Sequence, residues 1–197
     1  TSNTAIGFAA LRNNTTASNN SALGYEALTA NTTGDFNTAL GRQALAANTT
    51  AAANTAIGNQ ALNANTTGQY NTAIGSGALL SNTTASNNTA VGLNALVLNT
   101  TGYQNTAVGY NALDATTTGF QNVGIGLNAG TSHTTGNGNI LVGRVNGSAM
   151  TTESNMVLIG DEAGKAINST DANGTVAIGY QAGGAITSGA ANTAIGY

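Results

Sequence analysis

The chain has 197 residues, of which only 6% are charged, with a formal net charge of −3, 27 glycines, no proline and no cysteine. Its four lysine and arginine residues exclude a basic surface for nucleic acid or anionic lipid. The absence of cysteine excludes disulfides and thiolate metal sites, and no apolar run approaches the roughly 20 residues that cross a bilayer. The sequence begins with neither a methionine nor a signal peptide, from which we expect a segment of a longer, secreted precursor.

A repeat of 17 residues organises the whole sequence. Its clearest copy begins Asn54-Thr-Ala-Ile-Gly58 and starts again at Asn71. A fixed period of this kind predicts one structural unit stacked on itself, which is a solenoid. The glycine that closes Asn-Thr-Ala-Ile-Gly, called the anchor glycine from here on, recurs at Gly7, Gly24, Gly41, Gly58, Gly75, Gly92, Gly109, Gly126, Gly143, Gly160, Gly179 and Gly196.

Each repeat predicts one strand and one turn. Asn-Thr-Ala-Ile is typical of a short strand that ends at the anchor glycine, and the later Asn-Thr-Thr-Gly is typical of a turn. No window has the i, i+3, i+4, i+7 apolar spacing of an amphipathic helix. Stacking of the strands in parallel at about 4.8 Å per coil would give a rod about 55 Å long. The predicted fold is therefore all-β, a parallel β-solenoid or β-roll with 17-residue coils.

Two apolar columns run along this rod. A leucine column lies four residues after the anchor glycine, from Leu11 to Leu113, and becomes glycine from Gly130 onward. The residue before each anchor glycine is always aliphatic, so we expect it to face the core and expect Ile74→Asp to unfold the rod. This predicted core column is Ile6, Leu23, Leu40, Ile57, Ile74, Val91, Val108, Ile125, Val142, Ile159, Ile178 and Ile195.

An alanine column, from Ala5 to Ala107, precedes the predicted core column by one residue. Alternation along a strand places it on the opposite side. It is either a flat seam along which neighbouring chains pack, or a set of small residues in a crowded solenoid wall. We favour the seam, because a thin coil on its own buries little apolar surface against its ordering cost.

The chain divides into two zones of the same solenoid. Residues 1–125 carry the regular repeats, and residues 126–197 carry variant repeats, including one 19-residue coil at 161–179. As the leucine column becomes glycine, apolar volume moves to another column, as a core of fixed thickness requires. Beginning just before the boundary between the zones, aliphatic residues replace the threonine that begins each strand, at Val123, Ile140, Val157 and Val176.

Asparagines also form columns, which predict amide ladders at the corners of the coil. The first runs from Asn3 to Asn139, and the second runs from Asn14 to Asn99. From Asn31 onward the second ladder consists of Asn-x-Thr sequons, which a eukaryotic secretory pathway could glycosylate. One glycan per coil would be crowded at the strand spacing, so we interpret these residues as structural corners.

We expect no catalytic residue, no cofactor and no metal site. His133 is the single histidine and takes a place in the second ladder, with no second histidine or cysteine to share a metal. Asp161, Glu162 and Asp171 match no calcium-loop signature.

Exposed aromatic residues are the candidates for contact with a partner. Such rings can stack on sugars or anchor a protein, and they equally suit a cover over a solenoid corner or a seam between chains. The candidates are Tyr25, Phe36, Tyr70, Tyr103, Tyr110, Phe120 and Tyr180.

The late motif Thr175-Val-Ala-Ile-Gly179-Tyr-Gln-Ala-Gly183 resembles the head repeat of YadA-like trimeric autotransporter adhesins, in which Ser-Val-Ala-Ile-Gly units build a left-handed parallel β-roll. The earlier Asn-Thr-Ala-Ile-Gly form is similar to repeats of bacterial surface proteins and of phage tail fibres. The resemblance covers essentially the whole chain, although the 17-residue period is longer than the usual coil of the adhesin heads. It implies a parallel homotrimer, on a cell surface or virion, that attaches to host surfaces without enzymatic chemistry.

These features predict a non-enzymatic structural and adhesive segment of an extracellular fibre. Its partners would be further copies of the chain and a host-surface glycan or protein, with no nucleic acid and no membrane insertion. The alternative is a subunit of a self-polymerising extracellular filament. An ice-binding solenoid is a third and minor hypothesis, because the adjacent Thr32 and Thr33 would point to opposite faces of an extended chain.

Overall fold

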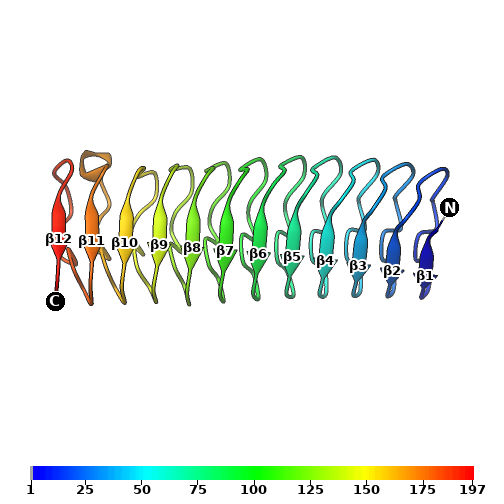
Figure 1. Ribbon diagram of the computed structural model, residues 1–197, viewed down its shortest axis with the longest axis horizontal. Coiled ribbons are helices and arrows are strands. Elements are labelled where there is room, and N and C mark those ends of the chain that lie inside the picture. The colour runs from blue at the N-terminus through cyan, green and yellow to red at the C-terminus, as the bar shows by residue number, and fades with distance from the viewer. Residues whose placement is uncertain (1) are drawn as a thin grey trace.

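The computed structural model describes residues 2–197, which form one rod of stacked coils with the chain termini at opposite ends (Figure 1). Twelve strands of three residues make one parallel sheet in sequential order. They are β1 (Thr4–Ile6), β2 (Ser21–Leu23), β3 (Thr38–Leu40), β4 (Thr55–Ile57), β5 (Thr72–Ile74), β6 (Thr89–Val91), β7 (Thr106–Val108), β8 (Val123–Ile125), β9 (Ile140–Val142), β10 (Val157–Ile159), β11 (Val176–Ile178) and β12 (Thr193–Ile195). No helix in this part of the chain has the length and apolar character needed to cross a bilayer.

The strands pair with a constant shift of one repeat. Ile57 lies beside Ile74, and Ile74 lies beside Val91. The 19-residue coil keeps this register, because Val157 pairs with Val176. That coil contains a 3-10 turn, η1 (Thr170–Ala172), which appears as the enlarged orange loop beside β11 in Figure 1. The predicted parallel β-solenoid and its 17-residue coil are confirmed.

Each strand ends at its anchor glycine because of the backbone conformation there. Gly75 has a φ of 132°, and a Cβ on it would lie 2.4 Å from the carbonyl oxygen of Gly92 in the next coil. The chain then turns through left-handed residues, such as Gln60 and Leu62 with φ values of 56° and 54°. A leucine in this conformation costs roughly 1–2 kcal/mol, so the position suits glycine, and Gly147 holds it in the variant zone with a φ of 54°.

The interior of the rod is lined by alanine and leucine, and the prediction for the core column was wrong. In β4 the central Ala56 is fully buried, whereas Ile57 is only partly buried. In β1 and β5 the corresponding Ile6 and Ile74 are 58% and 37% exposed. The whole predicted core column, from Ile6 to Ile195, lies on the outer side of the sheet.

The narrow cross-section of the coil explains this outcome. A three-residue strand puts its central side chain on one side of the sheet and its two flanking side chains on the other. Leu62 and its counterparts fill the interior from the opposite wall, so the strand has room for little more than a methyl group. The alanine column therefore lines the core as part of a crowded wall, and the interpretation of it as a seam between chains was also wrong.

The core is repacked in the variant zone. Leu141 and Leu158 replace the central alanine of the strand, and Met150 and Ile167 replace asparagines of the second ladder; all four are fully buried. Apolar volume does move between columns as predicted, but it does not move to the residues that begin the strands. Those residues, such as Val123, are on the outer side and compensate nothing in the core.

Candidate interaction surface

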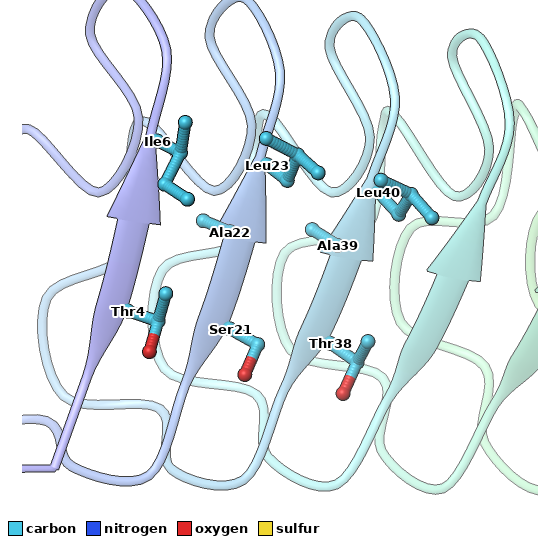
Figure 2. A pocket seen from close by; sticks show the side chains of 8 residues that line it. All are labelled: Thr4, Ile6, Ser21, Ala22, Leu23, Thr38, Ala39 and Leu40. Atoms are coloured by element: carbon cyan, nitrogen blue, oxygen red, sulfur yellow. The ribbon is translucent and has the colours of Figure 1, made fainter.

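The first and third residues of every strand form one continuous surface, called the outer sheet face from here on. Figure 2 shows its start, with Thr4, Ser21 and Thr38 in one row, Ile6, Leu23 and Leu40 in a second row, and Ala22 and Ala39 between the rows. These residues line a surface cavity of about 270 Å³. The second row is the predicted core column, Ile6, Leu23, Leu40, Ile57, Ile74, Val91, Val108, Ile125, Val142, Ile159, Ile178 and Ile195.

The composition of the outer sheet face changes along the rod. From β1 to β7 each strand presents one hydroxyl-bearing residue, threonine or serine, and one aliphatic residue. From β8 to β11 both outward residues are aliphatic: Val123 and Ile125, Ile140 and Val142, Val157 and Ile159, Val176 and Ile178. No outward residue of the twelve described strands is charged.

The aliphatic stretch of this face, β8–β11, is open to solvent in the single chain. Ile140 is 41% exposed, and Ile125, Ile159 and Ile178 are each 37–38% exposed. A contiguous exposed apolar patch on a rigid scaffold marks an interaction site. The outer sheet face is therefore the surface with the clearest capacity to bind a partner.

Four of the eleven charged side chains form a cluster outside the outer sheet face. Arg144 Nη2 lies 3.0 Å from Asp161 Oδ2 and 3.5 Å from Glu162 Oε1, and Lys165 Nζ lies 2.7 Å from Glu162 Oε2. Hydrogen bonds donated by Lys165 and by Gln181 lower the pKa of Glu162. These carboxylates thus contact cations of the same chain, and no group of three His, Cys, Asp or Glu side chains within residues 2–197 is placed to share a metal ion.

The first asparagine ladder is a continuous buried hydrogen-bonded chain. The backbone N–H of Asn54 donates to Asn37 Oδ1 at 3.0 Å, and Asn54 Nδ2 donates to the carbonyl of Gly68 at 2.9 Å. Asn71 N–H in turn donates to Asn54 Oδ1 at 2.9 Å. Each amide therefore satisfies a backbone N–H and a backbone carbonyl of the following coil, which explains how a coil with short strands can close around a small apolar core.

The second ladder has the same role at another corner. Asn48 Nδ2 donates to Asn31 Oδ1 at 2.8 Å and to the carbonyl of Ala51 at 3.0 Å. The five sequon asparagines from Asn31 to Asn99 are fully buried, so a glycan has no place on them in the folded rod. The prediction that these residues are structural corners is confirmed. His133 is also fully buried in this column.

The predicted contact aromatics do not converge on one site. Tyr103 stacks on Phe120 with ring centroids 4.9 Å apart, Tyr25 stacks on Phe8 at 5.4 Å, and Tyr180 meets Tyr197 at 5.4 Å. Each of these pairs occupies ring faces that a ligand would otherwise use. Six of the seven predicted rings are exposed and Phe120 is partly buried. The full predicted set is Tyr25, Phe36, Tyr70, Tyr103, Tyr110, Phe120 and Tyr180.

Comparison with known proteins gives no relative to argue from. No protein-family model, no curated protein and no solved structure matches this chain. Any function therefore has to be argued from the geometry of the rod and from the sequence pattern.

Sequence reasoning missed the outer sheet face because both sides of the strand carry apolar residues. One signal could have found it. The central position of the strand is alanine or glycine in ten of the twelve strands, whereas the third position varies among isoleucine, leucine and valine. A closed interior restricts volume more strictly than an open surface does, so the column with the smaller residues is the interior one.

Proposed function

We propose that this chain is a non-enzymatic structural and adhesive segment of an extracellular fibre, on a bacterial cell surface or a phage tail, in which three parallel copies pack through their outer sheet faces. The observation that supports the proposal is the uncharged, largely aliphatic face that runs along all twelve strands. A rod with this face in water would leave a patch of apolar side chains unburied. Packing of copies removes that patch from solvent.

The outer sheet face sets the area that such an assembly would bury. A rod about 55 Å long with strands about 10 Å wide offers about 550 Å² per chain. Three such faces around a common axis would bury about 1,650 Å² in all, or about 550 Å² for each pair of chains, which is small beside the about 1,200–2,000 Å² of a typical two-chain interface, so the assembly would rest on three small interfaces formed together.

The change of composition along the face favours a parallel arrangement. In a parallel assembly the aliphatic strands β8–β11 of each copy contact the same strands of the other copies. The threonine-bearing strands β1–β7 likewise contact β1–β7 of the other copies. An antiparallel arrangement would place threonine hydroxyls, such as that of Thr72, against aliphatic residues such as Ile159. Unpaired hydroxyls are costly in a buried apolar interface.

The adhesive part of the proposal rests on the corners that remain outside such an assembly. These corners carry the exposed rings of Phe36 and Tyr70. Tyrosine and phenylalanine combine an apolar ring with low conformational freedom, which suits contact with a glycan or a protein on a host surface.

Ice binding is a second candidate, favoured by one observation on the outer sheet face. Its first row presents a hydroxyl from each of β1–β7, at Thr4, Ser21, Thr38, Thr55, Thr72, Thr89 and Thr106. The strand spacing repeats these hydroxyls about every 4.8 Å on a regular surface. The threonine pairs at the turn are less suitable, because Thr32 Oγ1 donates to the carbonyl of Thr49 and is not free.

The native mass of the particle tests the proposal. We expect light scattering to give three times the 19.3 kDa of one chain. The double variant Ile159→Asp/Ile178→Asp should give single chains that keep the β-type circular dichroism spectrum, because both residues are on the outer sheet face and not in the core. Thr118→Asp/Thr135→Asp, two exposed positions away from that face, is the matched control and should stay trimeric.

Other masses would decide against the trimer. A large particle of no fixed mass would favour the self-polymerising filament. A single-chain parent with thermal hysteresis that Thr72→Leu abolishes would favour ice binding.

A further inference from the structure

The second ladder changes its chemistry in the middle of the rod. After Asn99 the column continues with Thr116, His133 and Met150, all fully buried. Asn99 Oδ1, which would accept from a further asparagine, has no hydrogen-bond partner. His133 thus stands at the junction between an amide-lined corner and an apolar one.

The hydrogen bonds around His133 favour one tautomer of its neutral ring. Asn139 Oδ1 accepts from the backbone N–H of Met156 at 3.0 Å, so the Asn139 nitrogen must be the atom that faces His133 Nε2, at 3.0 Å. That nitrogen carries two hydrogens for three neighbours, namely Asn122 Oδ1, the carbonyl of Glu153 and Nε2, and it offers no acceptor to a proton on Nε2, so an unprotonated Nε2 fits this contact best. The proton of the neutral ring lies on Nδ1, 3.2 Å from Thr116 Oγ1, and the Thr116 hydroxyl donates to the carbonyl of His133 at 3.1 Å.

The surroundings hold the ring in place. A Cβ on Gly136 would lie 2.6 Å from His133 Nε2, and a Cβ on Gly119 would lie 3.1 Å from its Cε1. Gly119 also interrupts the alternation of alanine and glycine at this position of the coil, where Ala85 and Gly102 precede it. The ring therefore occupies a slot that only these glycines leave open.

Glu153 is the one ionisable side chain, within the residues that the structure describes, that acts on His133. Its buried carboxylate accepts from the backbone N–H groups of Thr151 and Thr152. Its carbonyl accepts from Asn139 Nδ2 at 2.9 Å. Burial lowers the pKa of His133 to about 4, and this outweighs the charge and carbonyl of Glu153, which raise it.

We propose that His133 is an acid-sensitive break point of the rod, at which protonation of Nε2 opens the coils between β8 and β9. The new N–H would face the Asn139 amide, donor against donor, and would compete with it for the carbonyl of Glu153. Asn139 cannot simply turn over, because its Oδ1 holds Met156 N–H and its Nδ2 donates to Asn122 Oδ1 at 3.0 Å. The ladder on both sides of the junction is disturbed together.

The direction of the effect follows from linkage. The neutral ring is favoured in the folded rod, so its contribution is fully present above the unfolded pKa of 6.5 and is lost as the pH falls towards about 4. A difference of 2.5 pH units corresponds to about a 300-fold change in the unfolding equilibrium.

The chain has a single histidine, so one NMR signal reports on it without assignment. We expect the ¹³Cε1–¹Hε1 signal of the folded, native assembly to keep the neutral Nδ1–H form at pH 6. Hydrogen exchange measured by mass spectrometry, corrected for intrinsic rates, should rise around β8 and β9 between pH 7 and pH 4.5. Strands β3–β5 should stay protected.

Two variants of His133 distinguish the effect of its protonation from that of protonating the carboxylates. His133→Asn, which continues the ladder, and His133→Met, which extends the apolar corner from Met150, should both lose the local rise in exchange, and Glu153→Gln should retain it. A histidine that titrates near 6.5 in the folded rod would overturn the proposal without any variant. So would an acid-induced rise that persists in both His133 variants, or one spread evenly over all strands.

Discussion

The Cγ of Leu113 lies 2.6 Å from the point where a Cβ on Gly124 would stand. In the preceding coils the central residue of the strand is alanine, and at β8 it is glycine. The next buried leucine, Leu141, fills the space beside Gly130, where a Cβ would lie 2.6 Å from its Cδ1. The two leucines interlock, and the rod changes from one core type to the other within a single coil.

Gly124→Ala should therefore destabilise the rod by overpacking, by about 1–3 kcal/mol. Urea unfolding of the variant measures this cost. In the double variant Leu113→Ala/Gly124→Ala the total should be smaller than the sum of the two single changes, because the clash has been removed. Strictly additive values would mean that Leu113 moves aside freely.

Leu79→Ala should cost about 2–5 kcal/mol, because Leu79 is fully buried in the core cluster. Ile74→Ala, five residues earlier and partly exposed, should cost less than half as much under dilution to single chains. Ile74→Asp should also leave the single-chain fold intact, contrary to the expectation from the sequence. Thermal melts of the three variants provide the comparison, and equal losses for Leu79→Ala and Ile74→Ala would place Ile74 in the core after all.

Asn71→Ala should be costly although it removes no charge. It deprives the N–H of Asn88 of its acceptor and leaves the carbonyl of Ala85 with only the hydrogen bond from Asn82 Nδ2, and a buried unsatisfied group costs about 1–3 kcal/mol. Asn59→Ala, at an exposed position of the same rod, is the control and should change stability by no more than about 0.5 kcal/mol. Similar urea midpoints for the two variants would show that water replaces the ladder amide.

Two glycines in one coil should respond differently to a side chain. At Gly75 the φ of 132° and the carbonyl of Gly92 leave no room for a Cβ, so Gly75→Ala should cost more than about 1–3 kcal/mol. At Gly77, with a φ of 68°, the one close neighbour of a Cβ is the side-chain oxygen of Asn94, which can rotate. Gly77→Asn repeats the residue that Asn94 places there one coil later and should change the melting temperature little. A mild Gly75→Ala variant would contradict the role of the anchor glycine.

Much of the fold could be predicted from the sequence because each 17-residue repeat forms one coil of the stack. A period of 17 residues with asparagine and glycine at fixed places determined the coil, the parallel register of Ile57, Ile74 and Val91, and the buried corners. These features depend on backbone geometry and on local hydrogen bonding, which each copy of the repeat carries within itself.

Only the tertiary structure decided which side of the strand is the interior. In Thr55-Ala56-Ile57, alternation places Ala56 on one side of the strand and its two neighbours on the other. It does not determine which of these sides faces the interior of the coil. That choice depends on the volume left by Leu62 across the coil, a quantity that no single strand encodes. The narrow interior accepts alanine and leaves isoleucine on the outer side. The outward isoleucines form part of the outer sheet face, on which the proposed assembly depends.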